Sequence, residues 1–371
     1  MKRKLNKKNI IIISIIILII VVEIINPIKL YNKHVLKQLN YSNSSIETIL
    51  KYGKKDEVLN NKNNQVLDKI FSSKDYIDSN FNIYKDLNDS NLTNFVSLTN
   101  KLINKGYNTL EINSILKSGN EEDINNFLEL DYQEEAKEYL KFDFSKLSKY
   151  QEYVDYKTKN NLDYETSVLY VNIGLNKNYY EDINTIKDFS ITMLVNKYNG
   201  LDKDFIPDNL ISIDKEYAID SKQKGNKEMI ENFIKMSDDC KTETGFKIIV
   251  RSGYRDYKSQ EDTYNLYLKT YGLKYAESYA AHPGFSEHQT GLAVDIKAES
   301  SNTFAGTKES KWLLENAYKY GFILRYPDDL TDITGYKYES WHYRYVGLEI
   351  AKDIKDKKMT YDEYYIRYLD K

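Results

Sequence analysis

Two histidines and an aspartate in the last third of the chain have the residue types that a catalytic metal ion needs. His288 and Asp295 lie in one segment, residues 284–296, and His342 follows in an aromatic segment, residues 338–345. Catalytic zinc sites commonly use three protein ligands, drawn from imidazole and carboxylate, and leave a fourth position for water. The sequence therefore predicts a Zn²⁺ site at these three residues.

A carboxylate three residues before His342 could serve the same site as a base. Near bound zinc, a carboxylate can accept the proton of a water molecule as the water attacks a carbonyl carbon. Glu339 is the residue in that position. Side chains alternate between the two faces of a regular strand, so Glu339 and His342 would point to opposite sides of one. We therefore predict a bend or bulge between them.

The elements that hold these residues can be expected from local patterns. Residues 246–250 are typical of a strand, and a helix is expected over residues 257–270. Arg255 then lies at a strand-to-helix turn. A later helix is expected from about Glu309 to a C-cap at Gly321.

A second strand is expected to carry Asp295. Leu292, Val294 and Ile296 alternate with other residues, so they share one face of that strand. Asp295 consequently points to the opposite face. The pattern predicts a strand that is apolar on one side and presents a candidate metal ligand on the other.

Three motifs follow one another in this part of the chain. They are Ser252-Gly253-Tyr254-Arg255, Ser286-x-His288-x-x-Gly291-x-Ala293-x-Asp295 and Glu339-x-Trp341-His342. In this order they resemble the VanY-type D-alanyl-D-alanine carboxypeptidases, which belong to the LAS group of zinc metallopeptidases. The resemblance extends over residues 190–360 or so. It implies an α+β domain with a small antiparallel sheet flanked by helices, and zinc bound by the two histidines and the aspartate with Glu339 as general base.

The same resemblance implies three residues that contact the substrate. Arg255 would stabilise the oxyanion or anchor the substrate, and Ser286 and Gln260 would bind its terminal carboxylate. The implied reaction removes the terminal D-alanine from peptidoglycan stem peptides. An L,D-carboxypeptidase, a D-Ala-D-Ala dipeptidase and a non-catalytic zinc-containing surface module remain as alternatives.

Composition limits the other function classes. The single cysteine, Cys240, excludes an intrachain disulfide and a cysteine-rich zinc finger. The 53 basic and 56 acidic residues nearly balance and form no long block of either sign, so no nucleic-acid partner is expected. His282 is interpreted as a loop residue near the pocket and His34 as an ordinary polar residue, not as ligands.

The first thirty residues have the pattern of a membrane anchor. Five cations within residues 2–8 precede an apolar run from Ile10 to Ile25, and no small-residue cleavage site follows the run. We expect an uncleaved transmembrane helix in residues 1–30. By the positive-inside rule the N-terminus would be cytoplasmic and the remainder extracytoplasmic, in a single-pass protein of the cell membrane.

The middle of the chain is expected to be an all-helical spacer, residues 31–190, before the catalytic domain, residues 191–371. No proline occurs between residues 28 and 206, and apolar residues recur there at helical spacing. A capping box is expected at Ser44, and further helix starts near Asn108 and Asn120. The sequence identifies no protein partner for this spacer.

Overall fold

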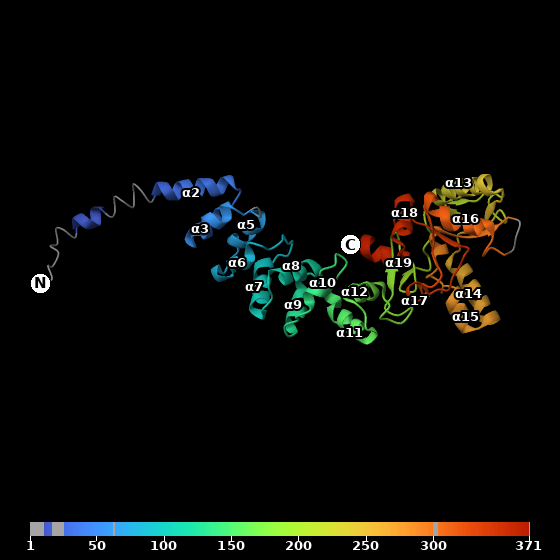
Figure 1. Ribbon diagram of the computed structural model, residues 1–371, viewed down its shortest axis with the longest axis horizontal. Coiled ribbons are helices and arrows are strands. Elements are labelled where there is room, and N and C mark those ends of the chain that lie inside the picture. The colour runs from blue at the N-terminus through green and yellow to red at the C-terminus, as the bar shows by residue number, and fades with distance from the viewer. Residues whose placement is uncertain (1–10, 17–25, 62–63, 300–302, 371) are drawn as a thin grey trace. The chain divides into compact units, whose positions relative to one another are not determined.

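The computed structural model describes residues 11–16, 26–61, 64–299 and 303–370 (Figure 1). The chain divides into two compact units, residues 1–151 and residues 152–371. The domain boundaries expected near residues 30 and 190 stay predictions.

The N-terminal unit and the start of the second unit are built from short helices. Their bounds are α2 Asn26–Gln38, α3 Asn43–Lys51, α4 Lys55–Leu59, α5 Asn64–Ser72, η2 Asp78–Asn80, α6 Phe81–Tyr84, α7 Phe95–Lys105, α8 Thr109–Ser118, α9 Glu121–Glu129, α10 Ala136–Leu140, η3 Leu147–Lys149, α11 Tyr150–Asn160 and α12 Tyr164–Ile173. The helical character expected for residues 31–190 is therefore found as far as Ile173. It is wrong after that point, because β1 (Asn184–Ile186) pairs in parallel with β2 (Asn199–Leu201).

Side-chain caps set where several of these helices begin. Asn108 and Asn120 each cap a helix, and each forms a full capping box with the acidic residue three positions later. The expected capping box at Ser44 is wrong. Ser42 caps α3 instead, accepting a hydrogen bond from the Ser45 backbone N–H, so the helix begins two residues earlier than the pattern suggested.

Two successive runs of helices have the same order of elements. The run α3, α4, α5, η2, α6 and α7 is followed by the run α8, α9, α10, η3, α11 and α12. Ile46 and Ile49 of α3 are buried, as are Ile112 and Ile115 of α8. The last helix of each run ends at a glycine in the left-handed conformation, Gly106 or Gly174, as such a C-cap requires. The two runs therefore share an element order and the same kind of helix end.

The transmembrane helix expected from Ile10 to Ile25 is not found. Among the described residues no helix is long and apolar enough to cross a membrane. A spanning helix needs about 20 predominantly apolar residues. Only residues 11–16 of the expected segment are described, as a short helix, and its other residues lie outside the described ranges. The fold-class prediction is corrected on this point, and the membrane contact has no support in the structure.

The C-terminal unit contains the expected small antiparallel sheet. Its strands are β5 Ile248–Ser252, β6 Ala293–Ala298, β7 Phe322–Leu324 and β8 His342–Tyr345, in the order β5-β6-β8-β7, with every neighbouring pair antiparallel. A separate antiparallel pair joins β3 (Leu210–Ser212) and β4 (Lys224–Asn226). The α+β character of this domain agrees with the prediction.

Helices α13 (Lys227–Thr244) and α16 (Lys308–Asn316) cover one face of the sheet (Figure 1). The core between them contains Phe233 of α13, Leu313 of α16 and the strand residues Val294, Ile296 and Tyr343. The other face of β6 and β8 is left for polar residues. Further helical segments of the unit are α14 Tyr257–Tyr271, α15 Leu273–Tyr279, η4 Glu287–Thr290 and α18 Leu348–Lys357.

The chain ends in short helical segments beyond α18. They are α19 Tyr361–Tyr364 and the π-helical turn η6 Tyr365–Leu369. The remaining short elements of the unit are η5 Ala317–Tyr320, which follows α16 and ends at Gly321 as expected, and α17 Thr331–Thr334. The α19 segment matters to the site because it carries Asp362, which lies within hydrogen-bond distance of Arg325.

Candidate active site

Asp295 and His342 face each other across two paired strands. They form a register pair between β6 and β8, so their side chains project from the same face of the sheet. His342 Nδ1 lies 3.2 Å from Asp295 Oδ1. Val294, on the same strand as Asp295, points into the core on the opposite face, as its alternation with Asp295 predicted.

His288 reaches the same point from the short helix η4. Its Nδ1 lies 2.7 Å from the carbonyl oxygen of Gly253, which accepts a hydrogen bond and leaves Nε2 directed at Asp295 Oδ1, 3.3 Å away. Gly253 can lie this close because it has no side chain: a Cβ there would fall 2.2 Å from the Lys224 carbonyl oxygen. The serine-glycine motif therefore orients a candidate ligand from the neighbouring strand.

These three side chains have the spacing of a zinc site. Their candidate donor atoms all lie within 4.8 Å of one another. Ligand atoms bound to one tetrahedral zinc ion are separated by about 3.4 Å, because each lies about 2.1 Å from the metal. The two measured separations from Asp295 Oδ1, 3.3 Å to His288 and 3.2 Å to His342, match that edge length. The donor set therefore fits zinc in chemistry and spacing.

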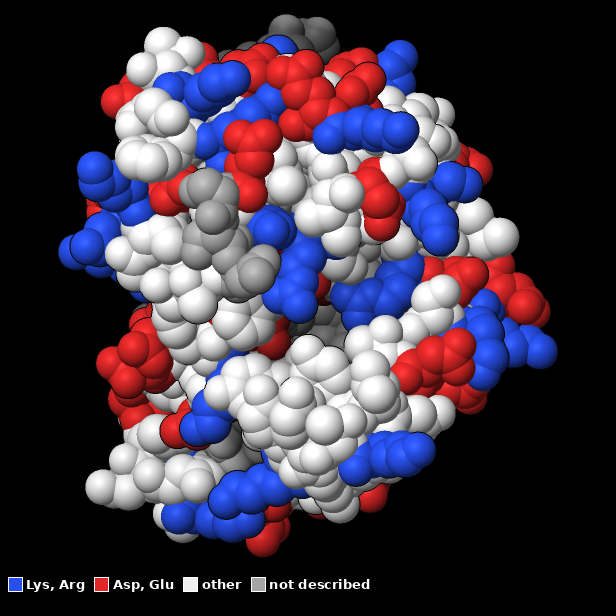
Figure 2. All heavy atoms as spheres, turned by 90° about the vertical axis from the view of Figure 1, so that its right-hand side faces the viewer, with Lys and Arg blue, Asp and Glu red and all other residues white. Residues whose placement is uncertain are grey.

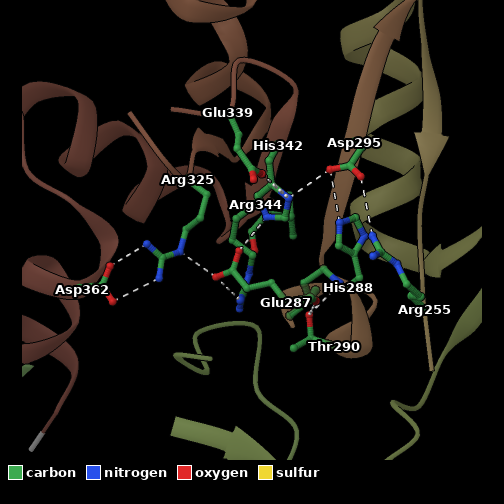
Figure 3. Close-up of polar contacts among 12 residues, drawn as sticks. Arg255, Glu287, His288, Thr290, Asp295, Arg325, Glu339, His342, Arg344 and Asp362 are labelled. Atoms are coloured by element: carbon green, nitrogen blue, oxygen red, sulfur yellow. Dashed lines mark hydrogen bonds and ion pairs between the residues drawn. The ribbon is translucent and has the colours of Figure 1, made fainter. Parts of the chain in front are cut away.

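Glu339 lies on the same side of β8 as His342 because the chain turns between them. The His342 backbone N–H donates a hydrogen bond to the Glu339 carbonyl oxygen, and β8 begins only at His342. Glu339 Oε2 consequently lies 4.0 Å from His342 Nδ1 (Figure 3). Burial raises the pKa of Glu339 to about 8. The turn is the bend that the spacing of the two residues required.

Arg255 enters the site from the turn between β5 and α14, as expected. Its Nη2 lies 3.8 Å from Asp295 Oδ2, and its Nη1 donates to Gln260 Oε1 at 3.0 Å. Gln260 is buried, and its amide nitrogen donates to the Ala281 carbonyl oxygen at 2.7 Å. Gln260 thus lies in the pocket, but its amide positions Arg255. Ser286 is buried and also lines the pocket.

The pocket holds every predicted site residue and adds an aromatic wall. Besides the residues already described it is lined by Tyr267, Tyr279, Tyr326, Tyr336 and Trp341. Trp341, the middle residue of the last motif, is therefore part of the pocket wall. The pocket thus combines aromatic rings with a few charged side chains, as small-molecule sites commonly do.

A buried charged network behind His342 was missed in the sequence. His342 Nε2 lies 3.1 Å from Glu287 Oε2, and Arg325 Nε and Arg344 Nη1 donate to Glu287 Oε1 at 2.8 and 3.2 Å (Figure 3). Arg325 also pairs with Asp362 at 2.6 Å. All four charged partners of this network have side chains at most 1% exposed.

The network affects both the pKa of the candidate ligand His342 and the direction of its ring nitrogens. Burial alone would lower the pKa of His342, but its hydrogen bonds to Asp295 and Glu287 outweigh burial and raise that pKa to about 9. Burial would raise the pKa of Glu287, and Arg325 and Arg344 reverse this and hold it well below its usual range. An ionised Glu287 accepts from Nε2 of His342, which leaves Nδ1 directed at Asp295. Glu287 is a neighbour of His288 in the motif, but no local pattern shows that it contacts His342.

The two histidines interpreted as non-ligands lie elsewhere. His282 Nε2 lies 2.6 Å from Glu277 Oε1, and the His282 ring stacks on Tyr180. His34 contacts Gln38 within α2. Among the described residues neither belongs to the His288, Asp295 and His342 group. Cys240 is a free cysteine buried in α13.

Comparison with known proteins assigns this domain. The family described as VanY, D-alanyl-D-alanine carboxypeptidase, matches residues 222–348, which include all of the predicted site residues. The proposed carboxypeptidase YodJ of Bacillus subtilis (strain 168) is 39% identical over 207 residues, covering 52% of this chain and 76% of YodJ. A D-alanyl-D-alanine carboxypeptidase of Enterococcus faecium is 39% identical over 146 residues, covering 39% of this chain but only 45% of that relative.

A solved structure of related sequence is the vancomycin-resistance D,D-pentapeptidase VanY from a VanB-type cassette, a point mutant in complex with Zn(II). It is 34% identical, with a TM-score of 0.42, over 47% of this chain and 97% of that one. The sequence matches make the chain a hydrolase that acts on peptide bonds, of the zinc metallopeptidase class. It belongs to the VanY family of D-alanyl-D-alanine carboxypeptidases, as its motifs predicted.

Proposed function

We propose that this chain is a zinc-dependent D,D-carboxypeptidase that removes the terminal D-alanine from peptidoglycan stem peptides. The observation that carries the proposal is the position of Glu339, whose Oε2 lies 4.0 Å from His342 Nδ1, beside three donors with zinc-like spacing. Membership of the VanY family supports the class of substrate. His288, Asp295 and His342 would hold the metal.

When bound, zinc supplies Lewis acidity that lowers the pKa of a water molecule toward about 7 and polarises the scissile carbonyl. Glu339 takes the proton of the attacking water at a carboxylate oxygen and passes it to the leaving amine. Its buried position supports this role, because burial raises the pKa of Glu339 to about 8 and so favours holding the proton between the two steps.

Arg255 supplies the positive charge that the substrate requires. Gln260 holds its guanidinium by a hydrogen bond at 3.0 Å, at the edge of the pocket that also contains Glu339. A fixed cation there can pair with the oxyanion that forms during attack or with the terminal carboxylate of the peptide. Ser286 lines the same pocket and would donate to that carboxylate.

The test is mass spectrometry of products from the purified full-length chain. A synthetic stem pentapeptide ending in D-Ala-D-Ala is incubated with and without a metal chelator, beside the matching tetrapeptide and free D-Ala-D-Ala. We expect loss of one alanine from the pentapeptide, suppressed by the chelator and restored by added zinc. The pentapeptide ending in L-Ala-L-Ala serves as the stereochemical control and should stay intact.

Each alternative activity gives a different product pattern. Cleavage of the tetrapeptide alone would assign an L,D-carboxypeptidase, and cleavage of free D-Ala-D-Ala alone would assign a dipeptidase. Zinc binding without any cleavage would assign a binding module. Any of these three results would contradict the proposed D,D-carboxypeptidase.

We propose further that the domain acts outside the cytoplasmic membrane, where cross-linked peptidoglycan lies. Its proposed substrate, a stem peptide of the wall polymer, is the ground for this location. Protease added to intact cells should degrade the domain while a cytoplasmic marker protein survives. Protection of the domain until the cells are lysed would contradict the proposed location.

A further inference from the structure

A row of four tyrosines runs along the helix pair α14–α15. The ring centroids of Tyr267 and Tyr271 are 5.8 Å apart, those of Tyr271 and Tyr275 are 4.6 Å apart, and those of Tyr275 and Tyr279 are 4.6 Å apart. Gly272, at φ +82, ends α14 and lets α15 follow, which brings the rings of the two helices together. We call Tyr267, Tyr271, Tyr275 and Tyr279 the tyrosine row.

Both ends of the tyrosine row line the candidate active site, and its two middle rings lie on the surface. Tyr267 and Tyr279 line the pocket that contains Glu339 and His342. Tyr271 and Tyr275 are 59% and 41% exposed. The row is therefore an aromatic surface that is continuous with the pocket.

The exposed rings are not needed to pack the helix pair. The buried contacts of α14 and α15 are made by Tyr264, Ala276 and Ala280, with part of Tyr267. Two large rings left in water beside a pocket form the kind of patch that marks a binding surface. Figure 2 shows a broad uncharged area at the level where Figure 1 places α14 and α15, beside a hollow in the surface.

The chemistry of the row suits a sugar ring. One face of a pyranose presents C–H groups, which pack on aromatic rings, and its edge presents hydroxyl groups, which pair with phenolic oxygens. Tyrosine offers both surfaces with little side-chain entropy to lose. A hydrocarbon chain would use the rings but not four phenolic hydroxyls, so a lipid fits the row less well.

We propose that the tyrosine row binds the glycan strand of peptidoglycan while the attached stem peptide enters the pocket. The proposal rests on the proposed function. If the C-terminal end of a stem peptide occupies the pocket, the rest of the substrate must extend outward from it. Tyr275 and Tyr271 continue the aromatic surface from Tyr279 at the pocket to the exterior, where that part of the substrate could lie. The C-terminal domain would then bind the glycan strand as well as the stem peptide.

The direct test is a pull-down of the full-length chain on immobilised peptidoglycan glycan strands from which an amidase has removed the peptides. The test variant is Tyr271→Ala/Tyr275→Ala, and Tyr271→Phe/Tyr275→Phe keeps the rings. Leu266→Ala is the matched control, because Leu266 is 61% exposed on α14 and lies outside the row. We expect the alanine pair to weaken glycan binding by about fivefold, with the phenylalanine pair between it and wild type.

The kinetic test compares a disaccharide-linked pentapeptide with the same pentapeptide free. For wild type, kcat/KM should be higher on the disaccharide-linked form, and the ratio of the two values should fall toward one in the alanine pair. Equal binding of glycan by wild type and the alanine pair would overturn the proposal. An alanine pair that keeps glycan binding but loses binding to phosphatidylglycerol vesicles would overturn it as well. A chain that binds glycan through the row yet cleaves no pentapeptide would contradict the proposed function and leave the glycan surface supported.

Discussion

The helical N-terminal unit and the C-terminal unit bury polar groups in different ways. In the described part of residues 1–151, Glu111 is the only buried charged side chain, and it completes the capping box of α8. The C-terminal unit buries Glu287, Arg325, Glu339 and Arg344, among others. Three of these four form one connected network with His342.

This difference distinguishes a unit whose buried groups serve stability from a unit whose buried groups also surround a candidate active site. A buried charge is costly unless it is paired, so a fold that needs only stability has little reason to gather several of them. The N-terminal helices are held by apolar contacts and backbone caps. The C-terminal unit places four of its buried charged side chains at or directly behind one pocket, which is where perturbed pKa values and chemistry are expected together.

The largest expected effect is on Glu339. The change Glu339→Gln removes the proton acceptor while keeping the shape of the side chain. We expect kcat on the D-Ala-D-Ala pentapeptide to fall about a thousandfold. Zinc affinity, measured by competition with a chromophoric chelator, should stay near the wild-type value. A variant that loses its metal would contradict the assignment of Glu339 as a base.

The next effect is on the stability of the C-terminal unit. Asp362→Ala removes a buried partner of Arg325, which lies 2.6 Å away, and leaves part of that charge unpaired. We expect the free energy of unfolding to fall by about 3 to 5 kcal/mol. Chemical denaturation followed by circular dichroism measures it.

A matched control for Asp362 lies in the neighbouring helix. Asp356→Ala removes an exposed carboxylate of α18 that pairs with Lys352 at 2.6 Å. It should leave the unfolding midpoint close to wild type, because exposed ion pairs contribute little. Equal loss in both variants would contradict a special role for the buried network.

A smaller effect is expected on metal affinity. Glu287→Gln weakens the acceptor that orients His342 through Nε2 at 3.1 Å. Outer partners of this kind typically change metal affinity by about 10- to 100-fold. Zinc affinity by chelator competition should therefore decrease, and Glu228→Gln, which loses only a bond from Tyr345 at 2.7 Å, should not change it. Unchanged zinc affinity in Glu287→Gln would contradict a role for Glu287 in positioning His342.

The smallest expected effect is on the stability of the helical N-terminal unit. Asn108→Ala removes the cap that accepts from the Leu110 and Glu111 backbone N–H groups. We expect the N-terminal unit to lose about 1 kcal/mol of stability. Leu110→Ala, at a 73% exposed position of the same helix, is the control and should change little. Peptidase activity should be unaffected by either change.

Much of the site could be read from spacing because its residues lie in three short motifs. Alternation in the strand after residue 292 placed Asp295 opposite the core, and the separation of Glu339 from His342 demanded a bend, which the structure provides as a turn. Local physics was sufficient in those cases, since side-chain direction follows backbone geometry over a few residues.

Other predictions failed where local patterns compete. The apolar run after residue 10 has the composition of an anchor, but no spanning helix is present among the described residues. Ser42 and Ser44 are equivalent as caps by residue type, and Ser42 also donates its backbone N–H to Asp68 Oδ1, a contact from a distant helix. Such tertiary contacts select one start among several allowed by sequence.

The sequence by itself determined the family, the candidate ligands, the candidate base and the α+β character of the C-terminal domain, because each depends on residue type and short-range spacing. Only the tertiary structure decided that Glu287, Arg325 and Asp362 stand behind His342, and that four tyrosines of α14 and α15 form one row. Those contacts join residues far apart in the chain or on separate helices. Their distances depend on how strands and helices pack, which no local periodicity encodes.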